Sequence, residues 1–179
     1  MRRVALLLIA MVFVQCHRAA AKRVTPPPPF DANAFIVSTM EIARSDLAIA
    51  ALPARKGAYA PPPARQLAAD VVRDQRTLLA AITAIAQRRG IASPAGVPDA
   101  QAALQENLAA VDDQFAQAFT LAMMQNLDAL DASMSRAAQS SDAELRHFAA
   151  TFTPLVRAGR AEAGAVLREV GGSPFRVAR

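Results

Sequence analysis

Cysteine is almost missing from this chain of 179 residues, since Cys16 is the only one. A single cysteine cannot form an intramolecular disulfide, so folding must rely on a packed core. Tryptophan is absent, tyrosine occurs once, and the basic residues are interspersed with acidic ones rather than gathered in a long run. Proteins that bind nucleic acid usually carry a clustered basic surface, so we do not expect nucleic acid as a partner.

Residues suited to catalysis are also scarce. The only histidines are His17 and His147, and His17 lies in a segment that we interpret below as removable. With His147 as the one remaining histidine, no serine, threonine or cysteine has an evident general base beside it, as a nucleophile would need. Neither Lys22 nor Lys56 follows a glycine-rich turn of the kind that holds phosphates. We therefore expect no enzymatic activity and no cofactor.

Alanine, in contrast, is abundant. Apolar residues make up 53% of the chain although aromatic residues make up only 5%. Alanine and leucine are the strongest helix formers, and the chain is long enough for one domain with its own core. The formal charge of +5 includes Arg2, Arg3 and Arg18. Without these three, the chain has 17 basic and 15 acidic residues. We predict an all-α, nearly neutral domain.

Residues 1–21 have the layout of a secretory signal peptide. Arg2 and Arg3 precede an apolar run from Val4 to Val14, and small residues at Ala19–Ala21 offer a cleavage site before Lys22. In a helix, this run would span only about half of a hydrocarbon core that is roughly 30 Å thick, which argues against a membrane anchor. We predict export, to the periplasm or to an outer-membrane-associated location.

Cys16 leaves a second interpretation of this segment open. A bacterial lipoprotein carries its lipidated cysteine directly after such an apolar run, but Gln15 stands where that signal has glycine or alanine. If Cys16 is removed with the signal peptide, we expect a soluble protein. If Cys16 is lipidated, we expect a membrane-anchored one, so membrane contact depends on this residue. Residues 22–30 form a proline-rich linker, which favours an extended polyproline spacer.

Residues 31–171 carry the periodicity of a helical bundle. Long amphipathic helices are predicted over about 31–50, from directly after the prolines of 59–63 to 89, and over 113–138 and 141–171, with a short helix over 99–109. Asp31 is suited to N-cap the first helix, with Phe30 and Phe35 as a hydrophobic staple, and Gly90 to end the second. We predict an up-down four-helix bundle. Gln75 points into the apolar face of its helix and needs a partner there.

The last of these helices has its own start and stop. Ser141 and Glu144 have the spacing of a capping box. Gly171 and Gly172 end the helix, leaving residues 172–179 as a tail. Pro154 removes one backbone hydrogen bond inside it, which predicts a kink just before the proline.

Several segments together resemble a known family. They are Glu41, Val71-Val72-Arg73-Asp74, Arg89-Gly90-Ile91, the stretch from Phe115 to Met123, and the stretch from Ser141 to Leu145 that runs on to Pro154. Taken together they resemble the exported bacterial family catalogued as domain of unknown function 4142, often labelled an outer membrane protein. The resemblance implies a ferritin-like four-helix arrangement and a periplasmic or cell-envelope location, but no established activity.

The resemblance also locates positions where members of that family typically have histidines inside the bundle. Here those positions hold Gln75, Leu127 and Gly159. Neither leucine nor glycine has a side chain that can bind a metal. A metal or acid-base role of those histidines therefore cannot be transferred to this chain.

One short motif has the spacing of a metal site, namely Glu144-x-x-His147. Di-iron bundles need two such motifs and two further glutamates, and only one copy exists here. Glu41 and Asp74 are the other weak candidates. Our leading hypothesis is a non-catalytic exported domain that binds an envelope protein or a small ligand, or has a structural role. The alternatives are a degenerate ferritin-like metal-binding protein and a lipid-anchored envelope lipoprotein.

Overall fold

The computed structural model describes residues 29–96 and 98–172, and the regular elements within them are all helical. They are α1 (Ala32–Ala50), η1 (Pro53–Arg55), η2 (Gly57–Tyr59), α2 (Pro62–Arg88), α3 (Asp99–Ala110), α4 (Phe115–Ala138) and α5 (Ala143–Gly172), where η marks a single 3-10 turn. The predicted all-α fold is therefore confirmed. The predicted signal peptide, Cys16, most of the linker and the tail lie outside the described residues. Within residues 29–96 and 98–172, no helix is both long and apolar enough to cross a membrane.

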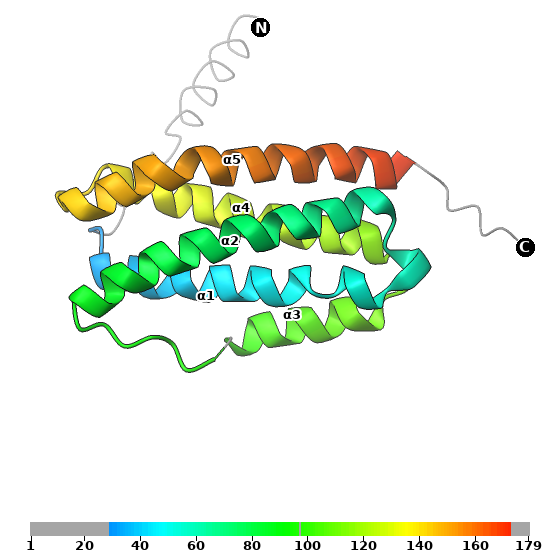
Figure 1. The fold of residues 1–179 in the computed structure, drawn as a ribbon, viewed down its shortest axis with the longest axis horizontal. Coiled ribbons are helices and arrows are strands. Elements are labelled where there is room, and N and C mark those ends of the chain that lie inside the picture. The colour runs from blue at the N-terminus through cyan, green and yellow to red at the C-terminus, as the bar shows by residue number, and fades with distance from the viewer. Residues whose placement is uncertain (1–28, 97, 173–179) are drawn as a thin grey trace, which may run out of the picture.

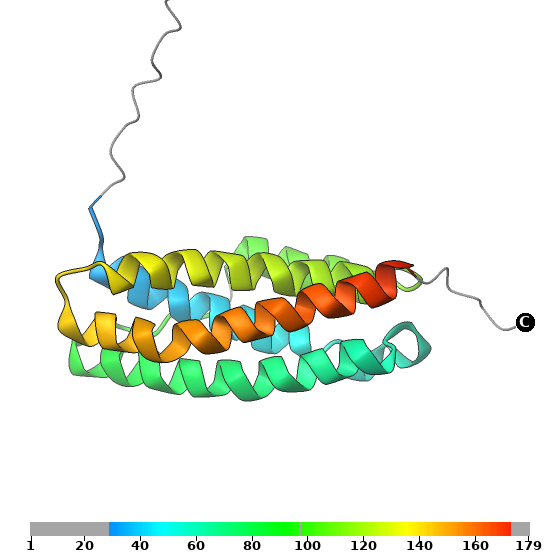
Figure 2. The ribbon, with the colours of Figure 1, turned by 90° about the horizontal axis from the view of Figure 1, so that it is seen from above.

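The four long helices lie lengthwise beside one another, and α3 lies along the outside of α1 (Figure 1). Seen from above, α5 lies between α2 and α4 (Figure 2). Chain direction reverses at the short links from α1 to α2 and from α4 to α5. Because α3 carries the chain back along the bundle, α2 and α4 run in the same direction (Figure 1). One such crossover is typical of ferritin-like bundles.

Local capping explains where two of the helices begin or end. The Asp31 carboxylate accepts hydrogen bonds from the backbone N–H groups of Asn33 and Ala34, and the rings of Phe30 and Phe35 lie 5.7 Å apart. At the end of α2, Gly90 has a φ of +66°, which glycine adopts without strain. The N–H of Ile91 then donates to the carbonyl of Ala86, closing the turn. All three predicted signals are confirmed.

The capping box predicted at Ser141 and Glu144 is wrong. Asp142 caps α5 instead, because its carboxylate accepts from the backbone N–H groups of Glu144 and Leu145, each at 3.1 Å. The Glu144 side chain does not reach back to the cap. It is held by the guanidinium groups of Arg88 and Arg89 at the end of α2. Helix α5 passes through Pro154 without a break, with the proline exposed, and the kink stays a prediction.

The apolar core consists of two separate clusters, one toward each end of the bundle. The cluster near the start of α1 includes Phe35, Met40, Ile82, Leu130, Leu145 and Phe148. The other includes Ile49, Leu67, Val71, Phe119, Met123 and Val166. Leu47 joins neither cluster, because it is only half-buried while its neighbour Asp46 is fully buried. The residues between the clusters, midway along α1, α2, α4 and α5, include the site described next.

Candidate functional site

Three buried polar side chains meet between the two apolar clusters, and we call them the polar layer: Asp46, Gln75 and Asn126. Each comes from a different helix, α1, α2 and α4. The Asp46 carboxylate accepts a hydrogen bond from Gln75 Nε2 at 2.9 Å and another from Asn126 Nδ2 at 2.6 Å. The partner that Gln75 was predicted to need is therefore Asp46. Buried polar groups usually occur in such hydrogen-bonded sets.

Asp46 is fully buried, and this changes its acidity. Burial raises the pKa of Asp46 to about 7 from an ordinary value of 3.8, and the hydrogen bond from Asn126 offsets part of that increase. A charged carboxylate loses its hydration inside a protein, so burial favours the protonated acid. Two amide donors partly replace the lost water. Asp46 is thus a proton-binding group that titrates near neutral pH.

A small cavity lies beside the polar layer, between α2, α4 and α5. It is small, with about 20 Å³ of space for the centres of water-sized spheres. The lining residues are Asp70, Val71, Asp74, Gln75, Leu78, Leu127, Leu155, Val156, Gly159 and Glu162. Gln75 belongs both to the polar layer and to the cavity wall, because it donates a hydrogen bond to Asp46 and also lines the cavity. Asp46 itself does not line the cavity.

The carbonyl oxygen of Gln75 has no hydrogen-bond partner among the described residues. Gln75 is only 3% exposed, so bulk water does not hydrate this oxygen freely. Its amide nitrogen donates to Asp46 on the α1 side, so Oε1 is the one polar atom of this side chain left without a partner. An unsatisfied buried acceptor costs about 1–3 kcal/mol. Gln75 is therefore a polar residue at the cavity wall with one unsatisfied acceptor.

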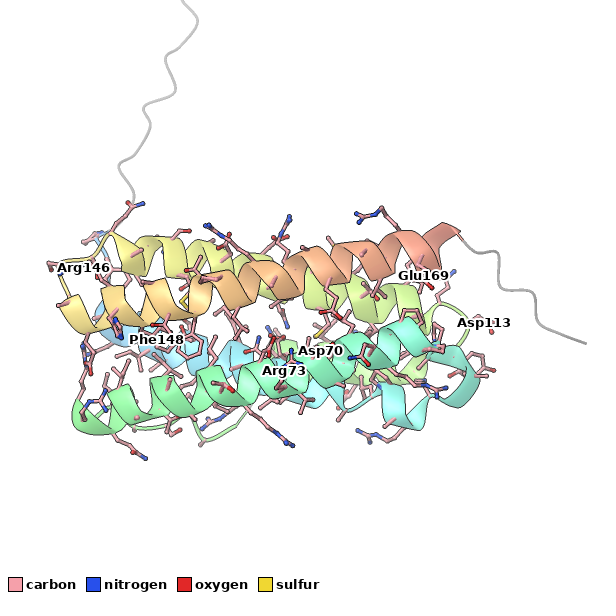
Figure 3. All side chains as sticks on the ribbon, turned by 45° about the horizontal axis from the view of Figure 1, so that its top comes forward. Asp70, Arg73, Asp113, Arg146, Phe148 and Glu169 are labelled. Carbon is pink, nitrogen blue, oxygen red and sulfur yellow. The ribbon has the colours of Figure 1, made fainter. Side chains whose placement is uncertain are left out.

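Three carboxylates, those of Asp70, Asp74 and Glu162, lie around the cavity on α2 and α5. Arg73 binds the carboxylates of both Asp70 and Asp74, the latter at 2.7 Å. Figure 3 shows Asp70 and Arg73 midway along the bundle on α2. A hydrogen bond from Gln66, and then those from Arg73, lower the pKa of Asp70, whereas burial and then the charge of Asp70 raise the pKa of Glu162. One arginine against three carboxyl groups leaves the cavity surroundings acidic.

The four metal candidates from the sequence are not brought together. Glu144 pairs with Arg88 and Arg89, while His147 is exposed on the next turn of α5. Asp74 pairs with Arg73, and Glu41 is half-buried on α1. Within residues 29–96 and 98–172, no three His, Cys, Asp or Glu side chains form a group that could hold a metal ion. Glu144 instead links the end of α2 to the start of α5.

The sequence model of the family described as Domain of unknown function (DUF4142) matches residues 16–166. The chain belongs to the DUF4142 family. Its fold is similar to that in the crystal structure of a DUF305 fragment from Deinococcus radiodurans, with a TM-score of 0.68 and 18% sequence identity over 79% of this chain and 99% of that one. At this identity the likeness shows the fold alone. Comparison with curated proteins finds no match.

In this DUF4142 chain, the three positions at which the resemblance implies histidines line one cavity. Gln75, Leu127 and Gly159 come from α2, α4 and α5, and all three contribute to its wall. A Cβ atom added at Gly159 would lie 3.7 Å from Leu127 Cδ1, so glycine and leucine leave space where two larger side chains would meet. The cavity therefore brings these three positions together in one place.

Sequence reasoning missed two members of the site, Asp46 and Asn126. Each lies at helical spacing from core residues: Asp46 is three residues after Ala43, and Asn126 three residues after Met123. That spacing places both on the buried face of their helices. The signal that marks Gln75, a polar residue within an apolar stripe, is thus also present at Asp46 and Asn126.

Proposed function

We propose that this DUF4142 chain is an exported, non-catalytic helical domain of the cell envelope that binds a small molecule in the cavity between α2, α4 and α5. One observation carries the proposal, namely the buried and unpartnered carbonyl oxygen of Gln75 at that cavity. The cavity lies between helices, where bundles commonly hold their ligands, and a residue of the polar layer forms part of its wall.

The packing around the cavity supports the same function. Gly159 interrupts the apolar stripe of α5 at the cavity wall, and alanine there would make only ordinary contacts with Leu127. Glycine in the middle of a helix costs about 0.5–1 kcal/mol relative to alanine. Retaining glycine keeps space open beside Gln75 at the expense of helix stability.

Fragment screening by ligand-observed NMR tests the proposal. We expect small polar fragments to bind the wild-type chain and to lose binding in Gly159→Leu, because a leucine side chain would occupy the cavity. Gly164→Leu is the matched control on the same helix, since Gly164 does not line the cavity. Thermal unfolding of both variants establishes that they fold. Fragments that bind the wild type and Gly159→Leu equally well would contradict a site in this cavity.

Export requires a separate measurement, the mass of the mature N-terminus in protein isolated from the cells that make it. A chain that begins at Lys22 would support export with signal removal. An acylated chain that begins at Cys16 would support the lipoprotein alternative, and the protein would then be membrane-anchored. An intact chain from Met1 in the cytoplasm would refute export.

A further inference from the structure

The polar layer contains one acid and two amides, and protonation of the acid changes how these groups can pair. Both oxygens of the Asp46 carboxylate accept hydrogen bonds, Oδ2 from Gln75 Nε2 and Oδ1 from Asn126 Nδ2. An ionised carboxylate only accepts, whereas a protonated one also carries an O–H group that donates. The hydrogen bonds in the structure are therefore those of the ionised form.

Protonation of either oxygen disturbs this pairing. The oxygen that gains the proton needs an acceptor in front of it but meets an amide N–H, and two donors cannot share a hydrogen bond. Gln75 Oε1 is buried and has no partner among residues 29–96 and 98–172. A half-turn of the Gln75 amide would bring this oxygen to Asp46. The last torsion of a glutamine side chain is nearly two-fold, and the two ends of its amide are almost alike in size, so the half-turn needs no repacking.

The Asp46 oxygen next to Gln75 is the better place for the proton. The hydrogen bond from Asn126 is shorter than that from Gln75, 2.6 Å against 2.9 Å, and short bonds to a charged group are the stronger ones. The bond from Asn126 is also the one that lowers the pKa of Asp46. A proton on Oδ1 would break this bond and leave Gln75 Oε1 unpaired. A proton on Oδ2 instead gives Oε1 a donor.

Burial controls the charge of Asp46 without help from a charged neighbour. Among the ion pairs of residues 29–96 and 98–172, none includes Asp46. Charged residues on the helices packed around it have other partners or are exposed: Arg44 on α1 binds the carbonyl of Pro94, Asp70 and Asp74 on α2 bind Arg73, Asp128 on α4 binds Arg160, and Glu106 on α3 is exposed. Glu41 lies about 140° around α1 from Asp46, and Glu162 on α5 belongs to the cavity wall.

We propose that the polar layer is a pH-sensitive switch, in which Asp46 takes up a proton from water on Oδ2 and the amide of Gln75 turns over. In the protonated state the Asp46 O–H donates to Gln75 Oε1, and in the ionised state Gln75 Nε2 donates to Asp46. Asn126 donates to Oδ1 in both states. Helices α1 and α2 thus stay joined while the hydrogen bond between them reverses direction. The switch needs no ligand in the cavity, so it does not depend on the proposed function.

Two-dimensional NMR of the isotopically labelled full chain, between about pH 5 and 9, tests this switch. The carboxyl carbon of Asp46 reports its protonation, and the side-chain amide of Gln75 reports its hydrogen bond. We expect both signals to change together with a midpoint near pH 7, and the exposed side chain of Gln87 on the same helix to stay nearly constant. A constant Gln75 amide while Asp46 titrates would overturn the switch, since the acid proton would then bond elsewhere, as to a backbone carbonyl. An Asp46 that does not titrate in this range would overturn it as well.

A variant fixes the layer in one of the two states. In Asp46→Asn the new amide can donate to Gln75 Oε1 and its oxygen can accept from Asn126, and neither group titrates. We expect its Gln75 signals to resemble those of the wild type at about pH 5 and to stay constant as the pH rises. Asp113→Asn, at an exposed position, should keep the wild-type transition. Gln75 signals in Asp46→Asn that match the wild type at high pH would refute the half-turn. If Asp46→Asn does not fold, the wild-type titration decides by itself.

Discussion

The buried carboxyl group of Asp46 makes stability depend on pH in a direction that can be measured. Burial raises its pKa to about 7, against an ordinary value of 3.8. Because the folded-state pKa is the higher one, the folded protein keeps a proton that the unfolded chain releases between these values. The stability contribution of Asp46 is therefore greatest below about pH 4, declines as the pH rises to about 7 and is constant above that.

The magnitude follows from the size of the shift. About three pKa units at 1.36 kcal/mol each correspond to roughly 4 kcal/mol of stability lost above pH 7. Small domains have net stabilities of only about 5–15 kcal/mol, so this is a large share. In Asp46→Asn the new amide group can donate to Gln75 Oε1 once that side chain turns over, and its oxygen can still accept from Asn126. We expect the variant to be about 2–4 kcal/mol more stable than wild type near pH 8, and the gain to be clearly smaller near pH 5.

Urea denaturation followed by circular dichroism, at a series of pH values between these limits, measures the effect. Asp113→Asn serves as the control because Asp113 is exposed. We expect the control to follow the wild-type pH profile, and Asp46→Asn to flatten it. Parallel profiles for all three proteins would refute the reasoning, since they would show that Asp46 ionises in the folded state at no cost.

Three further substitutions test other parts of the structure by the same denaturation assay. Gly90→Ala should destabilise the protein by about 1–2 kcal/mol, because φ is +66° there. Phe148→Ala, which removes a buried ring in edge contact with Phe35 and tilted contact with Phe152, should cost about 3–5 kcal/mol. The hydrogen bond from Arg89 lowers the pKa of Asp142 to about 2. Asp142→Asn keeps a helix cap but should lose roughly 1–2 kcal/mol near pH 7, and the difference should vanish as the pH falls from about 4 to 2.

Local features of the fold could be predicted because neighbouring residues determine them. The Asp31 cap, the contact between Phe30 and Phe35 and the glycine stop at Gly90 each involve residues a few positions apart. The capping box at Glu144 failed for a reason that is not local. Arg88 and Arg89 lie more than fifty residues earlier in the chain and reach Glu144 only because the end of α2 lies beside the start of α5.

The candidate site could be predicted in part. Gln75 interrupts an apolar stripe, which indicates a buried polar group, but its partner depends on the rotation of α1. Successive helical residues differ by about 100°, so Asp46 and Leu47 compete for the inward position. The structure places Asp46 inward, where Gln75 and Asn126 satisfy it. Packing among three helices, rather than the sequence of one, decides whether Asp46 or Leu47 takes the buried position.

The polar layer has a consequence for how the helices are aligned lengthwise. If α2 slid by one turn past α1, Val71 or Leu79 would face Asp46 in place of Gln75, and a carboxyl group would be buried without its donor. Such a loss costs several kilocalories per mole, whereas two apolar clusters alone would tolerate the shift with modest repacking. Asp46, Gln75 and Asn126 thus act as a register mark that selects one lengthwise arrangement of a bundle built largely from interchangeable alanines and leucines.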